Sequence, residues 1–213
     1  LLNGISLNDP QTGHNAFDFP VDIADIERIE VIEGPACRVY GTQSLLGAIN
    51  IITKKPTKPT LTAHLEGGSY GYGRLSGRAS ARTGDINHQV SAGYTRSDGY
   101  SRAKNGRLNT DFSGSKAFYQ GSYDDKMIHL AWHAGIADKG WGSGTFYATP
   151  TWQADNQYEH TTKLFTAIQA ENKTGRLHFR PSVYWNQNRD RYEGYRNQPD
   201  VMKYKIGRAS CRE

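Results

Sequence analysis

Residues 128–136 read IHLAWHAGI, and their side chains alternate between two kinds. The even-numbered positions, from Ile128 to Ile136, are apolar, whereas the odd-numbered positions hold histidine, alanine or glycine. Because successive side chains of a β-strand point to opposite faces, this period of two predicts a strand with one apolar face and one polar or small face. The strand is therefore expected to separate two different environments.

The same alternation recurs along most of the chain. About 11 residues at about 3.3 Å each, tilted by about 45°, rise roughly 25 Å, which matches the apolar band of an outer-membrane barrel. A soluble β-sandwich also alternates, but its strands average about 5–6 residues. The pattern predicts an all-β fold, a fragment of a transmembrane antiparallel β-barrel with about seven strands. These strands are expected near residues 60–70, 73–83, 86–97, 111–123, 126–138, 158–171 and 176–189.

The links between the predicted strands are alternately short and long. Short turns at one end and long loops at the other are typical of outer-membrane barrels, whose long loops face the outside of the cell. Aromatic residues near the predicted strand ends fit an aromatic girdle, although the ordinary preference of tyrosine and tryptophan for strands would also place them there. The tight-turn segments are residues 82–85, 124–126 and 172–175, and the long segments are residues 98–110, 139–157 and 190–205.

Composition excludes several other classes of protein. The net charge is +5, but the lysines and arginines are scattered rather than gathered into one patch, which argues against nucleic-acid binding. No run approaches the roughly 20 apolar residues that a transmembrane helix needs. Cys37 and Cys211 lie far apart without metal-ligand spacing, so neither a zinc site nor a disulfide framework is expected. Residues 206–213 break the preceding pattern and look like a translated sequencing adapter, so we expect a non-native tail there.

The first quarter of the chain follows a different pattern from the rest. Residues 29–32 and 48–52 are apolar runs without alternation, which predicts strands that are covered on both faces. The opening residues, Leu1 to Gly4, lack the features of a native start or a signal peptide, so we expect the chain to begin inside a longer protein. Domain boundaries are therefore expected to separate residues 1–56, residues 57–205 and the tail at 206–213.

Three short motifs connect residues 1–56 with a known family. Residues 25–35 read DIERIEVIEGP, residues 38–41 read RVYG, and residues 47–54 read GAINIITK. In this order they resemble the closing segment of the plug domain of TonB-dependent outer-membrane receptors. The resemblance implies that residues 1–56 are the C-terminal part of an α+β plug domain and that residues 57–205 are the N-terminal strands of the barrel.

The resemblance also implies roles for particular residues. In the plug turn, glycines permit backbone conformations that other residues avoid, and proline fixes the turn. Charged residues enclosed by a barrel must find partners, so the charges of the plug are expected to pair with the inner wall, with lumen water as the alternative partner. The plug-turn residues are Gly34, Pro35, Tyr40 and Gly41, and the expected plug–barrel contacts are Arg28, Glu30, Glu33, Arg74 and Arg78.

A second resemblance concerns the ligand. Residues 7–15 (LNDPQTGHN) and residues 184–192 (YWNQNRDRY) look like the cobalamin-receptor-like branch found in Bacteroidetes-type bacteria. The polar loop at the plug apex and the aromatic residues of the longest outer loop are therefore expected to bind ligand. A lone loop histidine is usually solvent-exposed, so no metal site and no cofactor are expected. The candidate ligand-binding residues are Asn8, Asp9, Gln11, Thr12, His14, Asn15, Trp141, Tyr147 and Trp152.

The function implied by the family is active import of a scarce nutrient across the outer membrane. Cobalamin is the first expected ligand, with siderophores or haem next and oligosaccharides after them. The expected partners are the TonB energy-transducing complex, the small-molecule ligand and outer-membrane lipid, with a surface lipoprotein as an additional candidate. An enzyme is not expected, because no nucleophile-elbow or phosphate-binding motif occurs. A passive pore or adhesin would lack the plug motif.

Overall fold

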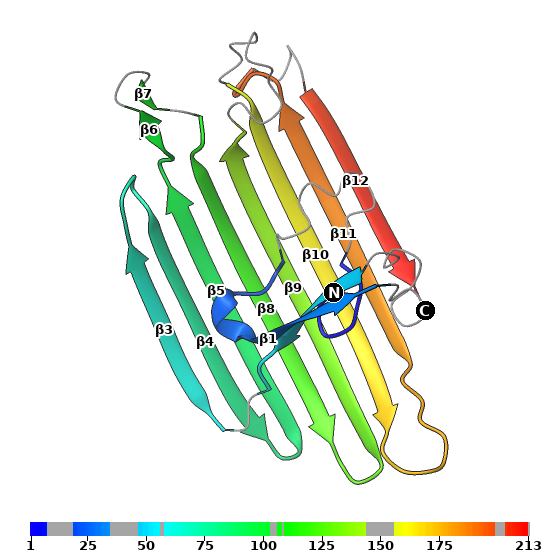
Figure 1. The fold of residues 1–213 in the computed structure, drawn as a ribbon. Helices are drawn as coiled ribbons and strands as arrows, with labels where there is room; N and C mark the ends of the chain where they lie inside the picture. Colours follow the sequence, from blue (N-terminus) through cyan, green and yellow to red (C-terminus); the bar gives the residue numbers. More distant parts are fainter. Residues whose placement is uncertain are drawn as a thin grey trace.

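Eight strands form one antiparallel sheet, here called the wall, in the computed structural model (Figure 1). The structure describes residues 1–7, 19–34, 47–55, 58–102, 106–107, 109–143, 156–198 and 203–212. The order across the wall is β12-β11-β10-β9-β8-β5-β4-β3. Its strands are β3 (Thr60–Gly67), β4 (Gly73–Thr83), β5 (Ile86–Ser97), β8 (Phe112–Asp124), β9 (Ile128–Gly142), β10 (Tyr158–Asn172), β11 (Ser182–Glu193) and β12 (Lys203–Arg212).

The predicted fold class is confirmed, and one predicted strand is displaced. The segment expected at 176–189 forms a strand only from Ser182. Pro181 has no N–H to donate to a ladder, so the segment only accepts backbone hydrogen bonds from β10, at the carbonyls of Pro181 and Phe179, while the side chain of Asn172 bonds the backbone of Leu177 and Phe179. Leu177 and Phe179 therefore precede β11, although their alternation predicts that they belong to the strand.

Strand β12 is an eighth member of the wall that the periodicity did not predict. It pairs with β11 from Tyr184 opposite Arg212 to Glu193 opposite Lys203. Most of it comes from residues 206–212, for which the break in the pattern predicts a non-native tail. The foreign origin of these residues stays a prediction, because a strand at the sheet edge needs only a backbone that can pair.

The two ends of the wall differ in their connections. At one end β8 and β9 are joined by a tight turn, in which the Oδ1 atom of Asp125 accepts hydrogen bonds from the amides of Met127 (2.6 Å) and Ile128 (2.7 Å). At the other end, β5 and β8 are separated by the small ribbon of β6 (Ser101–Arg102) and β7 (Gly106–Arg107). This arrangement agrees with short turns at one end and longer links at the other (Figure 1).

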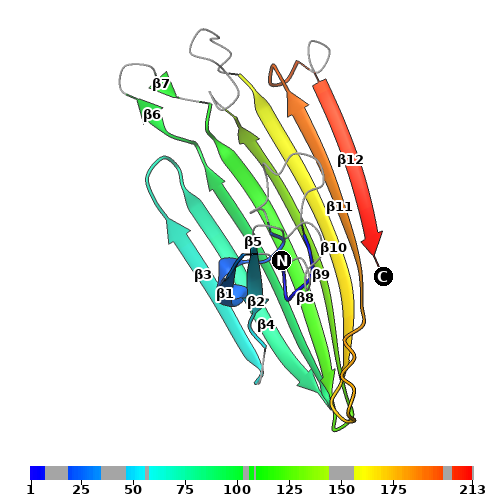
Figure 2. The ribbon, with the colours of Figure 1, turned by 45° about the vertical axis from the view of Figure 1, so that its right-hand side comes forward.

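The N-terminal segment, of which the structure describes residues 1–7, 19–34 and 47–55, lies in these described parts against the concave side of the wall (Figure 2). It contains one turn of 3-10 helix, η1 (Ile23–Asp25), followed by β1 (Ile26–Glu33) and β2 (Gly47–Thr53). The two strands pair in antiparallel fashion. The backbone of Leu1 and Asn3 bonds Ile51, which ties the first residues to the edge of this hairpin.

The two faces of the wall carry different side chains. On the concave face Phe118, Phe165 and Gln89 are almost fully buried, whereas Leu65 and Ile168 on the opposite face are 83% and 61% exposed. The alternation read from the sequence therefore places the apolar side chains on the outer surface, as a lipid-facing barrel requires. Among the described helical residues, no helix has the length and hydrophobicity that a membrane crossing needs.

An apolar cluster joins the N-terminal segment to the wall. A side chain at Gly135 would meet Pro20, because a Cβ atom placed there would lie 2.9 Å from the Cβ atom of that proline. The missing side chain therefore allows the N-terminal segment to approach β9 closely. The buried members of the cluster are Leu2, Ile5, Leu7, Val21 and Ile51 from the N-terminal segment and Phe118, Phe165 and Ala167 from the wall.

Candidate functional site

The helical turn η1 presents two carboxylates to the wall. Asp22 is its N-cap: the Oδ1 atom accepts a hydrogen bond from the amide of Ala24 at 2.8 Å, and its carbonyl accepts one from the amide of Asp25 at 3.0 Å. Aspartate is favoured at this position because its side chain satisfies an amide that has no partner within the helix. The turn therefore fixes the positions of both Asp22 and Asp25.

Asp22 forms an ion pair with the wall. Its Oδ1 atom lies 2.6 Å from Nη2 of Arg74 on β4, and the two side chains are only 11% and 14% exposed. The Nη1 atom of the same guanidinium lies 2.8 Å from Glu66 on β3. Arg74 thus holds one carboxylate of the wall and one of the N-terminal segment at the same time.

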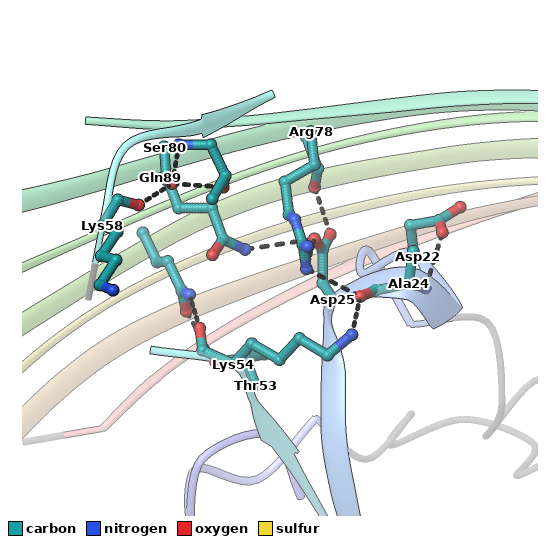
Figure 3. A network of polar contacts seen from close by, with 12 residues as sticks. Asp22, Ala24, Asp25, Thr53, Lys54, Lys58, Arg78, Ser80 and Gln89 are labelled. Carbon is teal, nitrogen blue, oxygen red and sulfur yellow. Dashed lines mark hydrogen bonds and ion pairs between the residues drawn. The ribbon is translucent and has the colours of Figure 1, made fainter. Parts of the chain in front are cut away.

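Asp25 is the most enclosed charged residue of this junction. Its side chain is fully buried, and it accepts hydrogen bonds from Ser91 and from the Nε2 atom of Gln89 at 3.2 Å, both on β5. The guanidinium of Arg78 lies 3.9 Å away (Figure 3). Burial raises the pKa of the Asp25 carboxyl, and the Ser91 hydroxyl and the Arg78 charge oppose this increase.

Backbone carbonyls add a second set of contacts below the carboxylates. The carbonyl of Ala24 accepts hydrogen bonds from Nη1 of Arg78 at 3.0 Å and from Nζ of Lys54 at 2.8 Å. The carbonyl of Lys54 accepts one from Nε2 of Gln120 on β8, whose Oε1 atom accepts a hydrogen bond from Thr53 at 2.6 Å (Figure 3). The end of β2 is therefore also bonded to the wall, through Gln120.

We use the name latch for the contacts that η1 and its N-cap make with the wall. The residues of the latch are Asp22, Ala24 and Asp25 of the N-terminal segment and Arg74, Arg78, Gln89 and Ser91 of the wall. All of these contacts are noncovalent, and most are hydrogen bonds whose net contribution to stability is about 0.5–1.5 kcal/mol each. Such a junction holds the segment in one position but can be broken and remade.

The predicted plug–barrel contacts divide between the wall and the N-terminal segment. Arg74 and Arg78 point inward and contact the N-terminal segment, as described above. Arg28 lies 2.9 Å from both Glu27 and Glu30, its side chain is 54% exposed, and Glu30 also accepts a hydrogen bond from Asn50. The described contacts of Arg28 and Glu30 thus lie within the hairpin, because each charge finds a partner one or two residues away or on the adjacent strand.

The remaining candidate residues are placed only in part. Glu33 ends β1 opposite Gly47, and Gly34 follows with a φ of +82°, a conformation that favours glycine. Trp141 lies in β9, and the Nζ atom of Lys139 is 5.0 Å from the centre of its ring. The candidates outside the described residues are Asn8, Asp9, Gln11, Thr12, His14, Asn15, Pro35, Tyr40, Gly41, Tyr147 and Trp152.

Sequence reasoning did not identify the acidic side of the latch. Asp22 could have been found as a helix N-cap, since it precedes the short turn and its type is favoured there. Asp25 is the first residue of the plug motif at residues 25–35, and the motif alone assigns it no partner on the wall. Gln89 and Ser91 lie on the polar face of a correctly predicted strand, and only the docking of η1 distinguishes them from other polar residues of that face. Within the described part of the chain, no group of three histidine, cysteine, aspartate or glutamate residues could hold a metal ion.

The beginning of the chain matches a known domain family. Residues 1–48 match the family model described as TonB-dependent Receptor Plug Domain. The chain is similar to the ferric aerobactin receptor of Klebsiella pneumoniae, with 33% identity over 107 residues, and to a vitamin B12 transporter of Photobacterium profundum, with 30% identity over 86 residues. These alignments cover 47% and 40% of this chain, and the chain spans 14% of each relative.

A solved structure supports the fold along the whole chain. The copper transporter OprC superimposes with a TM-score of 0.77 at 14% identity, covering 99% of this chain and 34% of the transporter. At this identity the likeness concerns the fold alone. The two relatives described above are, by name, a receptor and a transporter.

Proposed function

We propose that this chain, which is a segment of a TonB-dependent receptor, serves in the active import of a scarce nutrient across the outer membrane. The observation that carries the proposal is the latch. A plug-like segment is held against the concave face of a barrel-type wall by ion pairs and hydrogen bonds centred on one helical turn. Import through a plugged barrel needs such an attachment, because the plug must close the lumen and still be able to move.

The ligand proposal has two members. The relatives include a ferric aerobactin receptor and a vitamin B12 transporter, and the two names support a ferric siderophore and cobalamin equally. The apex loop supplies amide, hydroxyl and carboxylate groups, which suit the amide-rich edge of a corrinoid. Haem and oligosaccharides rank after these two ligands.

The partners follow from the same proposal. The TonB energy-transducing complex would supply the force that moves the plug, and outer-membrane lipid would cover the apolar outer surface of the wall. The exposure of Leu61, Leu65 and Ile168 on that surface supports the lipid contact, because exposed apolar side chains are stable in a hydrocarbon environment. A surface lipoprotein remains a candidate partner for the outer loops.

Equilibrium binding distinguishes between the two ligands. Purified full-length receptor would be titrated separately with cyanocobalamin and with ferric aerobactin, and a variant with Gln11, Thr12 and His14 changed to alanine would be measured beside it. Tight binding of one ligand that is lost in the variant identifies both the ligand and the role of the apex loop. Binding of neither ligand at micromolar concentration would remove both from the proposal.

Uptake tests the import function itself. Cells that carry the receptor should accumulate the bound ligand only when their TonB complex is intact. Binding without energy-dependent uptake would contradict import, and uptake that is equal with and without TonB would indicate a passive pore.

A further inference from the structure

A cavity of 240 Å³ lies beside the latch. Asp22 and Ile23 form its boundary on the side of the N-terminal segment, and residues of β4, β5, β8, β9 and β10 form the rest. Its position on the concave face means that the cavity shares Asp22 and Arg74 with the latch. A molecule bound there would touch the contacts that hold η1 to the wall.

Small residues on neighbouring strands create this hollow. Gly93 on β5 pairs with Lys116 on β8, Lys116 pairs with Ala137 on β9, and Gly114 of β8 pairs with Lys139. A Cβ atom at Gly93 would lie 3.1 Å from Oδ2 of Asp22, so a larger residue would crowd the carboxylate. Gly93, Gly114 and Ala137 have no side chain or a small one, so the space between Lys116 and Lys139 stays open down to the backbone of the sheet.

Three cationic side chains line the cavity on the concave face: Arg74, Lys116 and Lys139. Arg74 is paired with two carboxylates, that of Asp22, which also lines the cavity, and that of Glu66. Asp138 also lines the cavity, but its carboxylate bonds Thr162 at 2.8 Å and His160 at 3.1 Å. Both partners lie on strand positions that face the outer surface, since the buried neighbours of the same strand, such as Thr161, face inward.

Further polar groups complete the lining. Thr95 and Thr161 also line the cavity, and a threonine hydroxyl can donate to an anion. Lys116 and Lys139 each take part in interactions of their own, and the Nζ atom of Lys139 also lies 5.0 Å from the centre of the Trp141 ring. An anion in the cavity would be an additional acceptor for the guanidinium of Arg74, which Asp22 and Glu66 already hold in place.

We propose that this cavity binds a small anion with carboxylate groups, and that binding loosens the latch. Two carboxylate oxygens would accept hydrogen bonds from Arg74 and from one of the two lysines. Arg74 holds Asp22 through Nη2, so a bound carboxylate competes with Asp22 for the same guanidinium. The inference goes beyond the import proposal, because the cavity can be tested without any imported nutrient.

Calorimetric titration of the full-length receptor with citrate tests the site. At low salt, the wild type should bind citrate, and the Lys116→Gln, Lys139→Gln double variant should bind it at least about tenfold more weakly, because two charged donors are lost. Lys173→Gln is the matched control, since this lysine lies in the turn between β10 and β11 and pairs with Asp124. Absence of binding in the wild type, or equal affinity in all three proteins, would overturn the proposal.

A second measurement separates the site from its effect on the latch. The amide of Asp25 donates to the carbonyl of Asp22 within η1, so its hydrogen exchange reports the integrity of that turn. Citrate should accelerate this exchange in the wild type but not in the double lysine variant. Binding without any change in exchange would refute the competition for Arg74, and triethyl citrate, which is neutral, should produce neither heat nor faster exchange.

Discussion

The Nη2 atom of Arg74 lies 2.6 Å from the Oδ1 atom of Asp22, and this contact joins residues 52 positions apart in the sequence. The same carboxylate oxygen accepts the amide of Ala24 and so caps η1. One atom therefore serves both the local structure of the N-terminal segment and its attachment to the wall. Loss of the arginine would leave a poorly solvated carboxylate, which is costly in a protein interior.

Replacing Arg74 with methionine should therefore weaken the attachment of the N-terminal segment. We expect a loss of about 2–3 kcal/mol, less than for a fully buried pair because both side chains retain some solvent contact. The urea dependence of proteolytic cleavage within residues 19–34 would measure it in the full-length receptor. Arg82→Met is the matched control. That arginine is on the same strand, but its side chain is 57% exposed and its ion pair with Asp85 is long, at 3.9 Å.

A double-mutant cycle tests whether the cost belongs to the ion pair. Asp22→Asn combined with Arg74→Met should be less destabilising than the sum of the two single changes, since the second change then removes a residue without its partner. Additive costs would show that Arg74 acts through its packing or through Glu66 instead.

The buried Asp25 predicts how the attachment depends on pH. Burial raises the pKa of its carboxyl above the ordinary value of 3.8, so the folded protein binds this proton more tightly than the unfolded chain does. The stability due to this group is fully present below pH 3.8 and is lost as the pH rises through the raised value. Asp25→Asn should remove this pH dependence of stability. The measurement is the urea dependence of proteolytic cleavage, repeated at a series of pH values from neutral downward.

The pH dependence of stability expected from Asp125 has the opposite sign to that expected from Asp25. The backbone amides of Ile128 and Met127 lower the pKa of its carboxyl in the turn between β8 and β9. Its contribution is present above the unfolded pKa and is lost as the pH falls through the lowered value. If Asp25→Asn and Asp125→Asn changed the pH dependence in the same direction, the assignment of burial as the dominant effect at Asp25 would be wrong.

The sequence predicted the wall more completely than the latch, for a physical reason. Alternation identifies which face a residue occupies, and this was enough to point Arg74 and Arg78 inward. Alternation does not identify which charged residue of the N-terminal segment pairs with a given arginine of the wall, because several acidic residues of that segment could do so. Arg28 and Glu30 find partners within their own hairpin, which local proximity favours, whereas Asp22 reaches the wall only because η1 positions it there.

On the outer face of the wall, the packing of Trp132 requires a glycine at position 121. Trp132 lies across this glycine and donates from Nε1 to the hydroxyl of Tyr119 at 3.3 Å, while a Cβ atom at Gly121 would be only 2.2 Å from the indole ring. Gly121→Ala should therefore displace Trp132 and cost about 1–3 kcal/mol. Urea unfolding in lipid vesicles, followed by tryptophan fluorescence, would detect both effects.

Gly77→Ala is the control for that substitution. It changes the same residue type within a wall strand, but a Cβ atom at Gly77 would approach nothing closer than the carbonyl of Thr62, at 3.8 Å. Its unfolding midpoint should stay close to that of the wild type. Equal losses at Gly77 and Gly121 would mean that backbone flexibility, and not contact with Trp132, determines the cost.

The last prediction concerns the surface that lipid is proposed to cover. Ile136 is 43% exposed near the middle of β9, and its neighbour Ala137 is buried on the concave face. In a membrane, Ile136→Arg should cost about 2–4 kcal/mol, because the charge would lie near the midplane of the bilayer. Ile136→Leu keeps the apolar surface and should change the unfolding free energy by less than about 1.5 kcal/mol. Reversible unfolding of the full-length receptor in vesicles measures both values. An arginine tolerated as well as the leucine would show that this face of the wall does not contact lipid at that depth.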